Sequence, residues 1–165
     1  QDILKIPESK IPQLRRKIGT VFQDFKLLLN RTVFENVAIP LEVVQARDLT
    51  IEKAVSEVLD KVGLLEKANY FPAQLSGGEV QRTAIARAII AKPQVLLADE
   101  PTADLDHQTA ASVVKLLENI NEYDKTIIIM ATHNVAIVNH FKKRVVTLTK
   151  GKIDKDVKEG KYEAD

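Results

Sequence analysis

Two neighbouring carboxylates, Asp99 and Glu100, directly follow the apolar run of residues 95–98. Ligands of α/β proteins bind beyond the carboxyl ends of parallel strands, which is where such a pair would lie. Asp99 has the chemistry to hold Mg²⁺, directly or through water, and Glu100 could polarise an attacking water. The plainer alternative is a strand that simply ends in a polar loop.

A glycine-rich loop, residues 75–79, reads Leu-Ser-Gly-Gly-Glu and precedes a helical pattern. Its two glycines let backbone N–H groups approach an anion, the helix N-terminus adds a favourable dipole, and Ser76 adds a hydroxyl donor. Gln81 and Arg82 follow at once and strengthen the interpretation of a phosphate-facing loop. The alternative is a capped turn that only begins a helix.

Three further polar residues stand at the boundaries of expected elements. Gln23 follows a strand expected to end near it, and Gln is a neutral ligand for Mg²⁺ or water; the alternative is a surface loop residue. His133 follows the apolar run 126–131 and could face the same pocket as Asp99, although a lone histidine there is more often structural. Asp106 precedes a helix and is also a good N-cap.

The elements that must position these residues alternate between strand and helix. Residues 95–98 and 126–131 are continuous apolar runs, which suit strands buried on both faces of a parallel sheet. A helix with Val113, Leu117 and Ile120 inward lies between them, and a short helix at 135–141 and a strand at 144–149 follow. The pattern predicts an α/β fold with a mostly parallel sheet and a loosely ordered charged tail, residues 150–165.

The middle block, residues 24–92, is predicted to be helical. One apolar stripe runs from Ile51 to Val62, with Thr50 as the expected N-cap and Gly63 at the C-terminal end. A second helix is expected over residues 78–91. The motifs therefore divide the chain into a β part at 1–23, a helical part with the glycine-rich loop at 24–92, and an α/β part at 93–165.

Composition narrows the function classes. The chain has 165 residues, a net charge of +1, no cysteine and no tryptophan. The charge balance offers no reason to expect a nucleic-acid partner, and the absence of cysteine excludes disulfides, thiolate metal sites and cysteine nucleophiles. The sequence has 45% hydrophobic and 28% charged residues, an ordinary globular mixture, and no apolar run is long enough to cross a bilayer.

The order of these motifs resembles the ATP-binding cassette (ABC) ATPase family over essentially the whole chain. The most specific agreement is the loop at 75–79 with Gln81 and Arg82, followed by Leu-Leu-Ala-Asp-Glu-Pro-Thr at 96–102. The resemblance implies a P-loop NTPase-like fold with a helical subdomain, with ATP and Mg²⁺ as cofactors. It also implies an ATP hydrolase in which positioned donors and Mg²⁺ stabilise the transferring phosphoryl group.

Residue by residue, the resemblance implies the following roles around the γ-phosphate. Gln23 matches the Q-loop glutamine, which senses Mg²⁺ and the γ-phosphate. Asp99 matches the Walker B aspartate that holds the metal, and Glu100 the catalytic base. His133 matches the switch histidine that touches the γ-phosphate.

The resemblance also implies a head-to-tail homodimer that sandwiches ATP. Ser76, Gly77 and Gly78 match the signature loop, which contacts the ATP bound to the opposite subunit. Asp106 matches the D-loop aspartate at the dimer seam. ATP binding would hold the two subunits together, and hydrolysis would release them.

Residues 21–28, 30–33, 36–38 and 130–134 are similar to a cell-division subgroup of the family. That similarity implies a peripheral protein on the cytoplasmic face of the plasma membrane, at the division site. There it would act with an integral membrane partner to control peptidoglycan hydrolases indirectly, and the partner is expected to dock on residues 27–45, with Phe34, Val37, Ile39 and Leu41 as a candidate groove. The alternatives are the ATPase of a lipoprotein-release or macrolide exporter, and a non-hydrolysing interaction module.

The main departure of the sequence from the family is a missing motif, beside the smaller departures at Ala103 and Asn134. The P-loop pattern G-x-x-x-x-G-K-[ST] does not occur in the 165 residues. The resemblance places it upstream of Gln1, so we expect a C-terminal fragment that hydrolyses ATP negligibly by itself. We further expect the P-loop strand to belong beside the strand at 95–98, so that its loss leaves a buried edge unpaired and the chain prone to aggregate.

Overall fold

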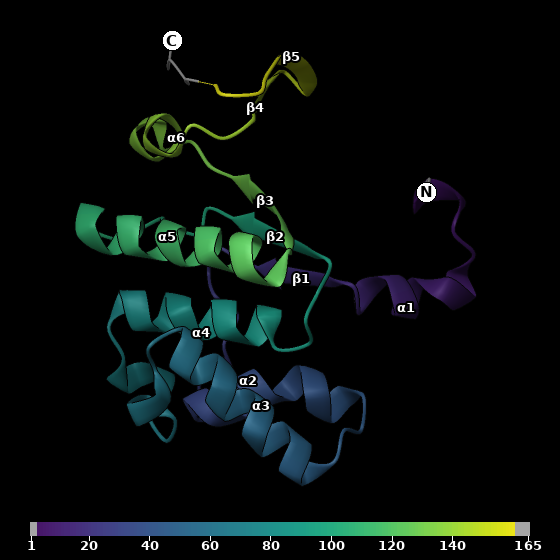
Figure 1. Ribbon diagram of the computed structural model, residues 1–165, viewed down its shortest axis with the longest axis vertical. Coiled ribbons are helices and arrows are strands. Elements are labelled where there is room, and N and C mark those ends of the chain that lie inside the picture. The colour runs from purple at the N-terminus through teal and green to yellow at the C-terminus, as the bar shows by residue number, and fades with distance from the viewer. Residues whose placement is uncertain (1–2, 161–165) are drawn as a thin grey trace. The chain divides into compact units, whose positions relative to one another are not determined.

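The structure, a computed structural model, describes residues 3–160. Its contacts divide the chain into two compact units, Gln1–Ala131 and Thr132–Asp165 (Figure 1). The division into parts at residues 1–23, 24–92 and 93–165, which is based on the positions of the motifs, stays a prediction. Within the described residues, no helix is both long enough and apolar enough to cross a bilayer.

The first unit contains a three-stranded parallel sheet in the order β1–β2–β3. Strands β1 (Ile18–Val21), β2 (Val95–Asp99) and β3 (Ile127–Ala131) lie in register, with Val21 level with Ala98 and Asp99 level with Ala131. The α/β class with a parallel sheet is therefore confirmed. The expectation that β2 has lost a neighbour is wrong, because β2 is the central strand and its backbone is hydrogen-bonded on both sides.

Two helices, α4 (Gly77–Ile89) and α5 (His107–Asp124), cover one face of this sheet. Side chains of that face, including Val21, Leu96 and Ala98, form a core cluster with both helices. On the opposite face Leu97, Ile127 and Ile129 are exposed. The prediction that β2 and β3 are buried on both faces is thus wrong, because in the described part of the chain the apolar runs are covered from one side.

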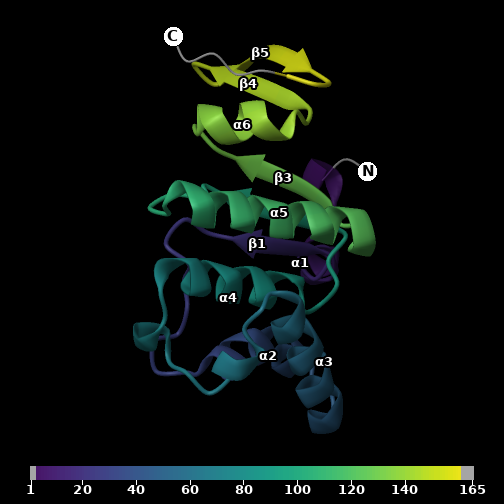
Figure 2. The ribbon, with the colours of Figure 1, turned by 60° about the vertical axis from the view of Figure 1, so that its left-hand side comes forward.

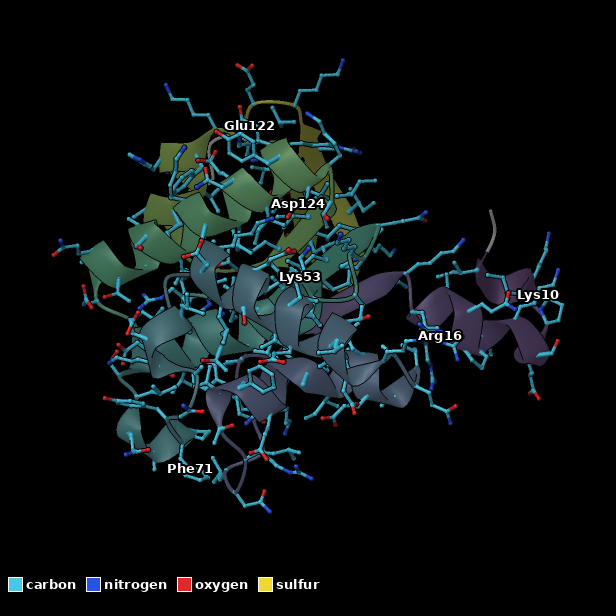
Figure 3. All side chains as sticks on the ribbon, turned by 60° about the horizontal axis from the view of Figure 1, so that its bottom comes forward. Lys10, Arg16, Lys53, Phe71, Glu122 and Asp124 are labelled. Atoms are coloured by element: carbon cyan, nitrogen blue, oxygen red, sulfur yellow. The ribbon has the colours of Figure 1, made fainter. Side chains whose placement is uncertain are left out.

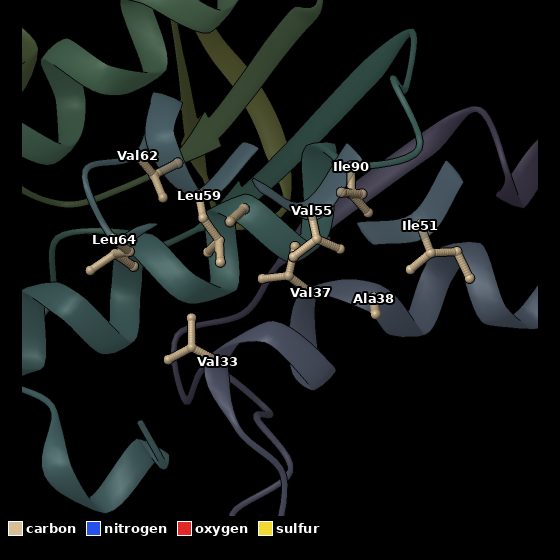
Figure 4. Close-up of a cluster of buried hydrophobic side chains, with 10 residues drawn as sticks. Val33, Val37, Ala38, Ile51, Val55, Leu59, Val62, Leu64 and Ile90 are labelled. Carbon is tan, nitrogen blue, oxygen red and sulfur yellow. The ribbon is translucent and has the colours of Figure 1, made fainter. Parts of the chain in front are cut away.

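The helical block consists of α2 (Val33–Val43) and α3 (Asp48–Lys61), which pack against α4 (Figure 2). Thr32 and Glu35 form a capping box at the start of α2. Helix α3 begins at Asp48, two residues before the predicted cap at Thr50, whereas Gly63 follows its end in a left-handed conformation as expected. Figure 4 shows the cluster inside this block, to which α2 contributes Val37, α3 contributes Val55, and the C-cap that follows α4 contributes Ile90.

Helix α4 belongs to both core clusters, and this determines its position. Ala86 and Ile90 face the helical block, whereas Ala84, Ile85 and Ile89 face the sheet. The helix lies so close to β1 that a Cβ atom on Gly19 would stand 2.4 Å from the carbonyl oxygen of Ala88. Only glycine permits this approach, which fixes α4 on the sheet.

Short elements complete the first unit, and a hairpin characterises the second. The first unit also has three-residue 3₁₀ turns η1 (Ile3–Lys5), η2 (Glu8–Lys10), η3 (Leu65–Lys67) and η4 (Pro72–Gln74), and the helix α1 (Ile11–Arg15). The second unit contains α6 (Val135–Phe141) and an antiparallel pair, β4 (Val145–Thr149) and β5 (Lys152–Val157). The expectation of a loosely ordered tail is therefore wrong for residues 152–157, and residues 161–165 lie outside the described part.

Candidate nucleotide-binding site

An open polar pocket of about 350 Å³ lies where α4 and α5 begin. It brings together the predicted signature residues and the predicted D-loop aspartate, although 27 or more positions separate them in sequence. The residues that line it are Ser76, Gly77, Gly78, Arg82, Asp104, Leu105, Asp106 and Thr109. The pocket therefore joins two motifs that the sequence singled out independently.

The start of α4 is held in place by its own first turn and by α5. Oε2 of Glu79 accepts a hydrogen bond of 2.8 Å from the Ser76 N–H. A Cβ atom on Gly78 would lie 2.5 Å from Cγ2 of Thr109, so the two helix N-termini touch at this glycine. The first N–H groups of a helix lack intrahelical partners, and both helices turn that end toward the pocket.

Asp106 is the N-cap of α5, so the structural interpretation of this residue is confirmed. Its side chain accepts hydrogen bonds of 3.0 Å from the N–H groups of Gln108 and Thr109. The hydroxyl of Thr109 donates to its other carboxylate oxygen. These bonds to Thr109, with that from Gln108, lower the pKa of Asp106 below its ordinary value, which keeps a negative charge at the rim of the pocket.

A second group of predicted residues lies along the carboxyl edge of the sheet. Asp99 ends β2, and Gln23 follows β1 by two residues, so the register brings both to the same edge. Glu100 adopts a left-handed backbone conformation with φ of 44°, and its N–H donates to the Ala131 carbonyl. This turn directs the chain away from the sheet immediately after Asp99, because a non-glycine residue at positive φ marks a sharp change of direction.

His133 lies two residues beyond β3, at the start of the second unit. Its predicted approach to Glu100 therefore stays a prediction. Within residues 3–160, no group of three or more His, Asp or Glu side chains is arranged to hold a metal ion.

The donor chemistry of both places fits a nucleotide with Mg²⁺. Helix α4 presents a glycine-rich N-terminus and the guanidinium of Arg82 at the pocket, and both suit phosphate oxygens. Asp99 is exposed at the sheet edge and offers an oxygen ligand for the metal. The arrangement can bind a phosphate at one place and a hydrated cation at the other.

Sequence reasoning missed three residues in these surroundings. Thr109 braces both Gly78 and Asp106, Lys67 pairs with Glu79, and Arg87 bonds to the chain after Gln23. The spacing from Asp106 to Thr109 is typical of a capped helix and could have indicated the first. The predicted phosphate-facing role of Gln81 is wrong, because its side chain is buried inside the unit and does not line the pocket.

Comparison with known proteins agrees with this geometry. A model of the ABC transporter family matches residues 1–103. The chain is 54% identical over 162 residues to the cell division ATP-binding protein FtsE of Bacillus subtilis, a match that covers 98% of this chain and 71% of the relative. It is 49% identical to the FtsE proteins of Mycobacterium tuberculosis and Escherichia coli, covering 70% and 67% of those relatives and 98% and 91% of this chain.

Solved structures show the same architecture. The ATP-binding cassette MJ0796, in a dimeric post-hydrolysis state with ADP and Pi, superposes with a TM-score of 0.80 at 35% identity, covering 96% of this chain and 70% of that one. CbiO1 from Clostridium perfringens, part of the ABC transporter complex cbiONQ, gives 0.86 at 30% identity, covering 93% and 61%. The α/β architecture with a parallel sheet thus agrees with the solved cassettes, and the chain belongs to the ABC transporter family.

Proposed function

We propose that this chain forms, in the complete protein, most of the ATP-hydrolysing subunit of an FtsE-type complex, with FtsX as its integral membrane partner. One observation carries the proposal: Ser76–Gly78 and Asp106, which were singled out separately, line one pocket. The 54% identity to an FtsE protein supports the cell-division role, including indirect control of peptidoglycan hydrolysis. The protein would be peripheral, on the cytoplasmic face of the plasma membrane at the division site.

The proposed reaction divides the work between the two places. ATP supplies the γ-phosphoryl group, and Mg²⁺ neutralises its charge. The signature loop of one copy binds the phosphates of an ATP held by the second copy, and Asp106 lies at the seam between them. Asp99 and Gln23 would hold the metal, Glu100 would orient the attacking water and accept its proton, and His133 would donate to the γ-phosphate.

The test uses the complete protein, extended through its expected P-loop, with Glu100→Gln as the variant. Loss of the carboxylate removes the base but leaves the binding groups, so turnover should fall by about 10²-fold or more. ATP should still bind, and size-exclusion chromatography with MgATP should show a stable dimer. Glu122→Gln is the matched control, because Glu122 is an exposed carboxylate near the end of α5 (Figure 3).

Two outcomes would contradict the proposal. Unchanged turnover in the Glu100→Gln variant would remove Glu100 from the chemistry. A complete protein that neither binds nor hydrolyses ATP would instead support the non-hydrolysing interaction module. The 165-residue chain itself is expected to show negligible turnover, and robust hydrolysis by it would show that no upstream P-loop is needed.

The membrane partner is proposed to dock beside α2 rather than in the groove expected from sequence. Val37 is fully buried, whereas Phe34, Ile39 and Leu41 are half-buried, and Phe34 and Leu41 pack against the core cluster, so only part of the expected groove is exposed. Val43 is the last residue of α2 and Leu29 precedes the helix by four residues; they are 73% and 74% exposed, and Phe71, labelled in Figure 3, is also exposed. We propose that these exposed apolar groups contact the partner.

This docking surface can be tested by affinity purification of FtsX with the complete protein. Leu29→Asp and Val43→Asp should each abolish recovery of FtsX while ATP binding is retained. Tyr123→Asp is the control, since Tyr123 is 74% exposed on α5 and lies apart from α2 in sequence. Recovery of an exporter's membrane subunit instead of FtsX would support the lipoprotein-release or macrolide alternative.

A further inference from the structure

The guanidinium of Arg87 joins α4 to the chain that follows Gln23. Its Nη1 donates a hydrogen bond of 2.6 Å to the carbonyl of Lys26, and its Nη2 donates one of 2.6 Å to the carbonyl of Phe25. These partners lie 61 and 62 residues away in sequence. A planar fork with parallel donors can bind two successive carbonyls, which an ammonium group cannot do with the same geometry.

The turn that Arg87 holds contains Gln23 and is intrinsically unfavourable. The Phe25 N–H donates to the Phe22 carbonyl, so Gln23 and Asp24 are the two central residues of the turn. Phe25 and Lys26 then adopt left-handed conformations, with φ of 59° and 48°. Non-glycine residues avoid this region, and two in succession persist only where surrounding contacts impose them.

Other contacts of the same turn do not replace the Arg87 bonds. Phe25 packs partly against the core cluster beneath the sheet, which anchors its side chain but not the carbonyls. Asp24 and Lys26 form an exposed ion pair, a weak restraint at the surface. The guanidinium adds two side-chain bonds to a segment whose backbone also has a bond from the Lys26 N–H to the Asp24 carbonyl, and its burial lowers the pKa of Arg87 from its ordinary value.

Helix α4 links this contact to the phosphate-binding pocket. The signature residues Ser76–Gly78 stand at its beginning, and Arg87 stands near its end. Helix α4 is packed between two core clusters, so its two ends keep fixed positions relative to each other. The position of the turn at Gln23 is thereby tied to the same element that carries the signature loop.

We propose that Arg87 is a positioning residue for ATP hydrolysis: it holds the turn containing Gln23 against α4, so that the Gln23 amide reaches the metal at the carboxyl edge of the sheet. The inference rests on the proposed function, since it assigns Arg87 a role that acts through Gln23. It differs from a general stabilising role, because its effect on turnover disappears when Gln23 no longer contributes.

The experiment is a double-mutant cycle in the complete protein with Arg87→Gln, Gln23→Ala and the combined variant. Arg87→Gln alone should lower kcat about tenfold, leave KM for ATP nearly unchanged and raise the Mg²⁺ concentration needed for half-maximal turnover. In the Gln23→Ala background the same change should lower kcat by less than about twofold. Arg87→Lys, which keeps the charge but not the fork, should behave like Arg87→Gln.

A structural readout makes the test independent of catalysis. Hydrogen exchange of the backbone amides in residues 22–27 should accelerate in Arg87→Gln and in Arg87→Lys. The matched control is Lys61→Gln, which breaks the bond of 2.7 Å from α3 to Asp124 on α5 and should leave exchange in residues 22–27 unchanged. Comparable unfolding midpoints for Arg87→Gln and Lys61→Gln would exclude global destabilisation as the cause of the faster exchange.

The outcomes separate this inference from the proposed function. Equal losses of kcat in the presence and absence of Gln23 would overturn the positioning role, as would unchanged exchange in residues 22–27. If Gln23→Ala itself leaves hydrolysis intact, the role proposed for Gln23 fails, and the positioning role assigned to Arg87 fails with it. If the complete protein hydrolyses no ATP at all, the proposed function fails, and the exchange measurement still determines whether Arg87 holds the turn.

Discussion

The ammonium nitrogen of Lys67 lies 2.6 Å from Oε1 of Glu79, while Oε2 of the same carboxylate accepts the Ser76 N–H at 2.8 Å. Lys67 also stands 5.5 Å from the centre of the Tyr70 ring. The carbonyl of Tyr70 in turn accepts the N–H of Val33 at the start of α2. One carboxylate thus connects the signature loop with the helical block.

This ion pair predicts a specific acid sensitivity. The bond from Lys67, helped by the Ser76 N–H, lowers the pKa of Glu79 from 4.5 to about 2. Because the folded-state pKa is depressed, the stabilisation is complete above pH 4.5 and is lost as the pH falls toward 2. Glu79→Gln should lower the free energy of unfolding at pH 7 by about 1 kcal/mol, measured by urea denaturation.

The pH series supplies the control for this prediction. The difference between wild type and Glu79→Gln should shrink between pH 4.5 and 2. Glu57→Gln, which removes an exposed carboxylate on α3, should follow the wild type throughout. A Glu79→Gln variant that keeps its full deficit at pH 2 would show that the lost interaction is not the charge on Glu79.

The contact between the N-termini of α4 and α5 predicts that a substitution at Thr109 will compensate for a destabilising substitution at Gly78. In Gly78→Ala the new methyl would stand 2.5 Å from Cγ2 of Thr109, so the helices must separate at the pocket. We expect about 1–3 kcal/mol of destabilisation and a loss of ATP hydrolysis in the complete protein. Adding Thr109→Ser removes the methyl but keeps the hydroxyl that bonds to Asp106, and should restore much of the stability.

The neighbouring glycine is the natural control for the pair. A Cβ atom on Gly77 would meet Leu105 at 3.5 Å, an ordinary contact, so Gly77→Ala should leave stability unchanged or slightly improved. Thermal unfolding of the wild type and of the three variants, Gly78→Ala, Gly78→Ala with Thr109→Ser, and Gly77→Ala, distinguishes the cases. Equal losses for Gly77→Ala and Gly78→Ala would mean that the loop itself, rather than the contact with Thr109, limits substitution.

Motifs with a local physical cause could be predicted from sequence, and long-range contacts could not. The apolar stripe of α3 and the Asp106 cap follow from spacing and side-chain chemistry, and both are confirmed. The one-sided exposure of Ile127 and Ile129 did not follow, because an apolar run does not reveal how many layers cover it. Nor did the bonds of Arg87, because its partners are backbone carbonyls, which have no sequence signature.

The order of the strands shows a similar limit. A continuous apolar run indicates a buried strand, but it does not say which strands are its neighbours. The pairing of β2 with both β1 and β3 is determined by crossover connections through α4 and α5, which are tertiary features. The strand β5 was missed because its charged residues, such as Lys152 and Asp154, resemble a solvated tail.

The side-chain amide of Asn36 is predicted to contribute strongly to the free energy of unfolding. The side chain is fully buried; its Oδ1 accepts the Leu28 N–H at 2.8 Å, and its Nδ2 faces the carbonyls of Leu28, Arg31 and Thr32 at 2.9–3.1 Å. Asn36→Ala removes all of these side-chain bonds and takes away the acceptor of the Leu28 N–H, so it should cost about 2 kcal/mol of unfolding free energy. Urea denaturation measures the loss.

The variant Asn36→Asp tests whether the amide nitrogen of Asn36 acts as the hydrogen-bond donor. Asn36→Asp replaces the donor with a carboxylate that faces three carbonyl oxygens, so at pH 7 it should be less stable than Asn36→Ala. Burial raises the pKa of the new acid in the folded state, so the penalty should shrink as the pH falls through that raised pKa, where the group becomes protonated and can donate, and should be gone below about pH 4. A variant whose stability does not recover in acid would contradict the assigned orientation of the amide.

Replacement of Gln81 by an apolar residue of similar size is predicted to increase the stability of the protein. Its Nε2 is buried without a hydrogen-bond partner in the described part of the chain, and its side chain is 1% exposed. Gln81→Met keeps the volume and removes the unsatisfied donor, so thermal unfolding should show a gain of about 1 kcal/mol. Gln81→Glu buries a charge and should be strongly destabilised; a loss of stability in Gln81→Met would reveal a partner for Nε2.

The parallel pairing of β1 with β2 has a consequence for how the polypeptide acquires its structure. Residues 22–94 separate the two strands, so their pairing closes a long loop, and no hairpin can bring the strands together. Such topologies fold slowly, because chain entropy is lost before the distant contacts form. During synthesis, β1 therefore stays unpaired until α2, α3 and α4 have left the ribosome. Only when β2 follows them can the backbone of β1 form its hydrogen bonds with that strand.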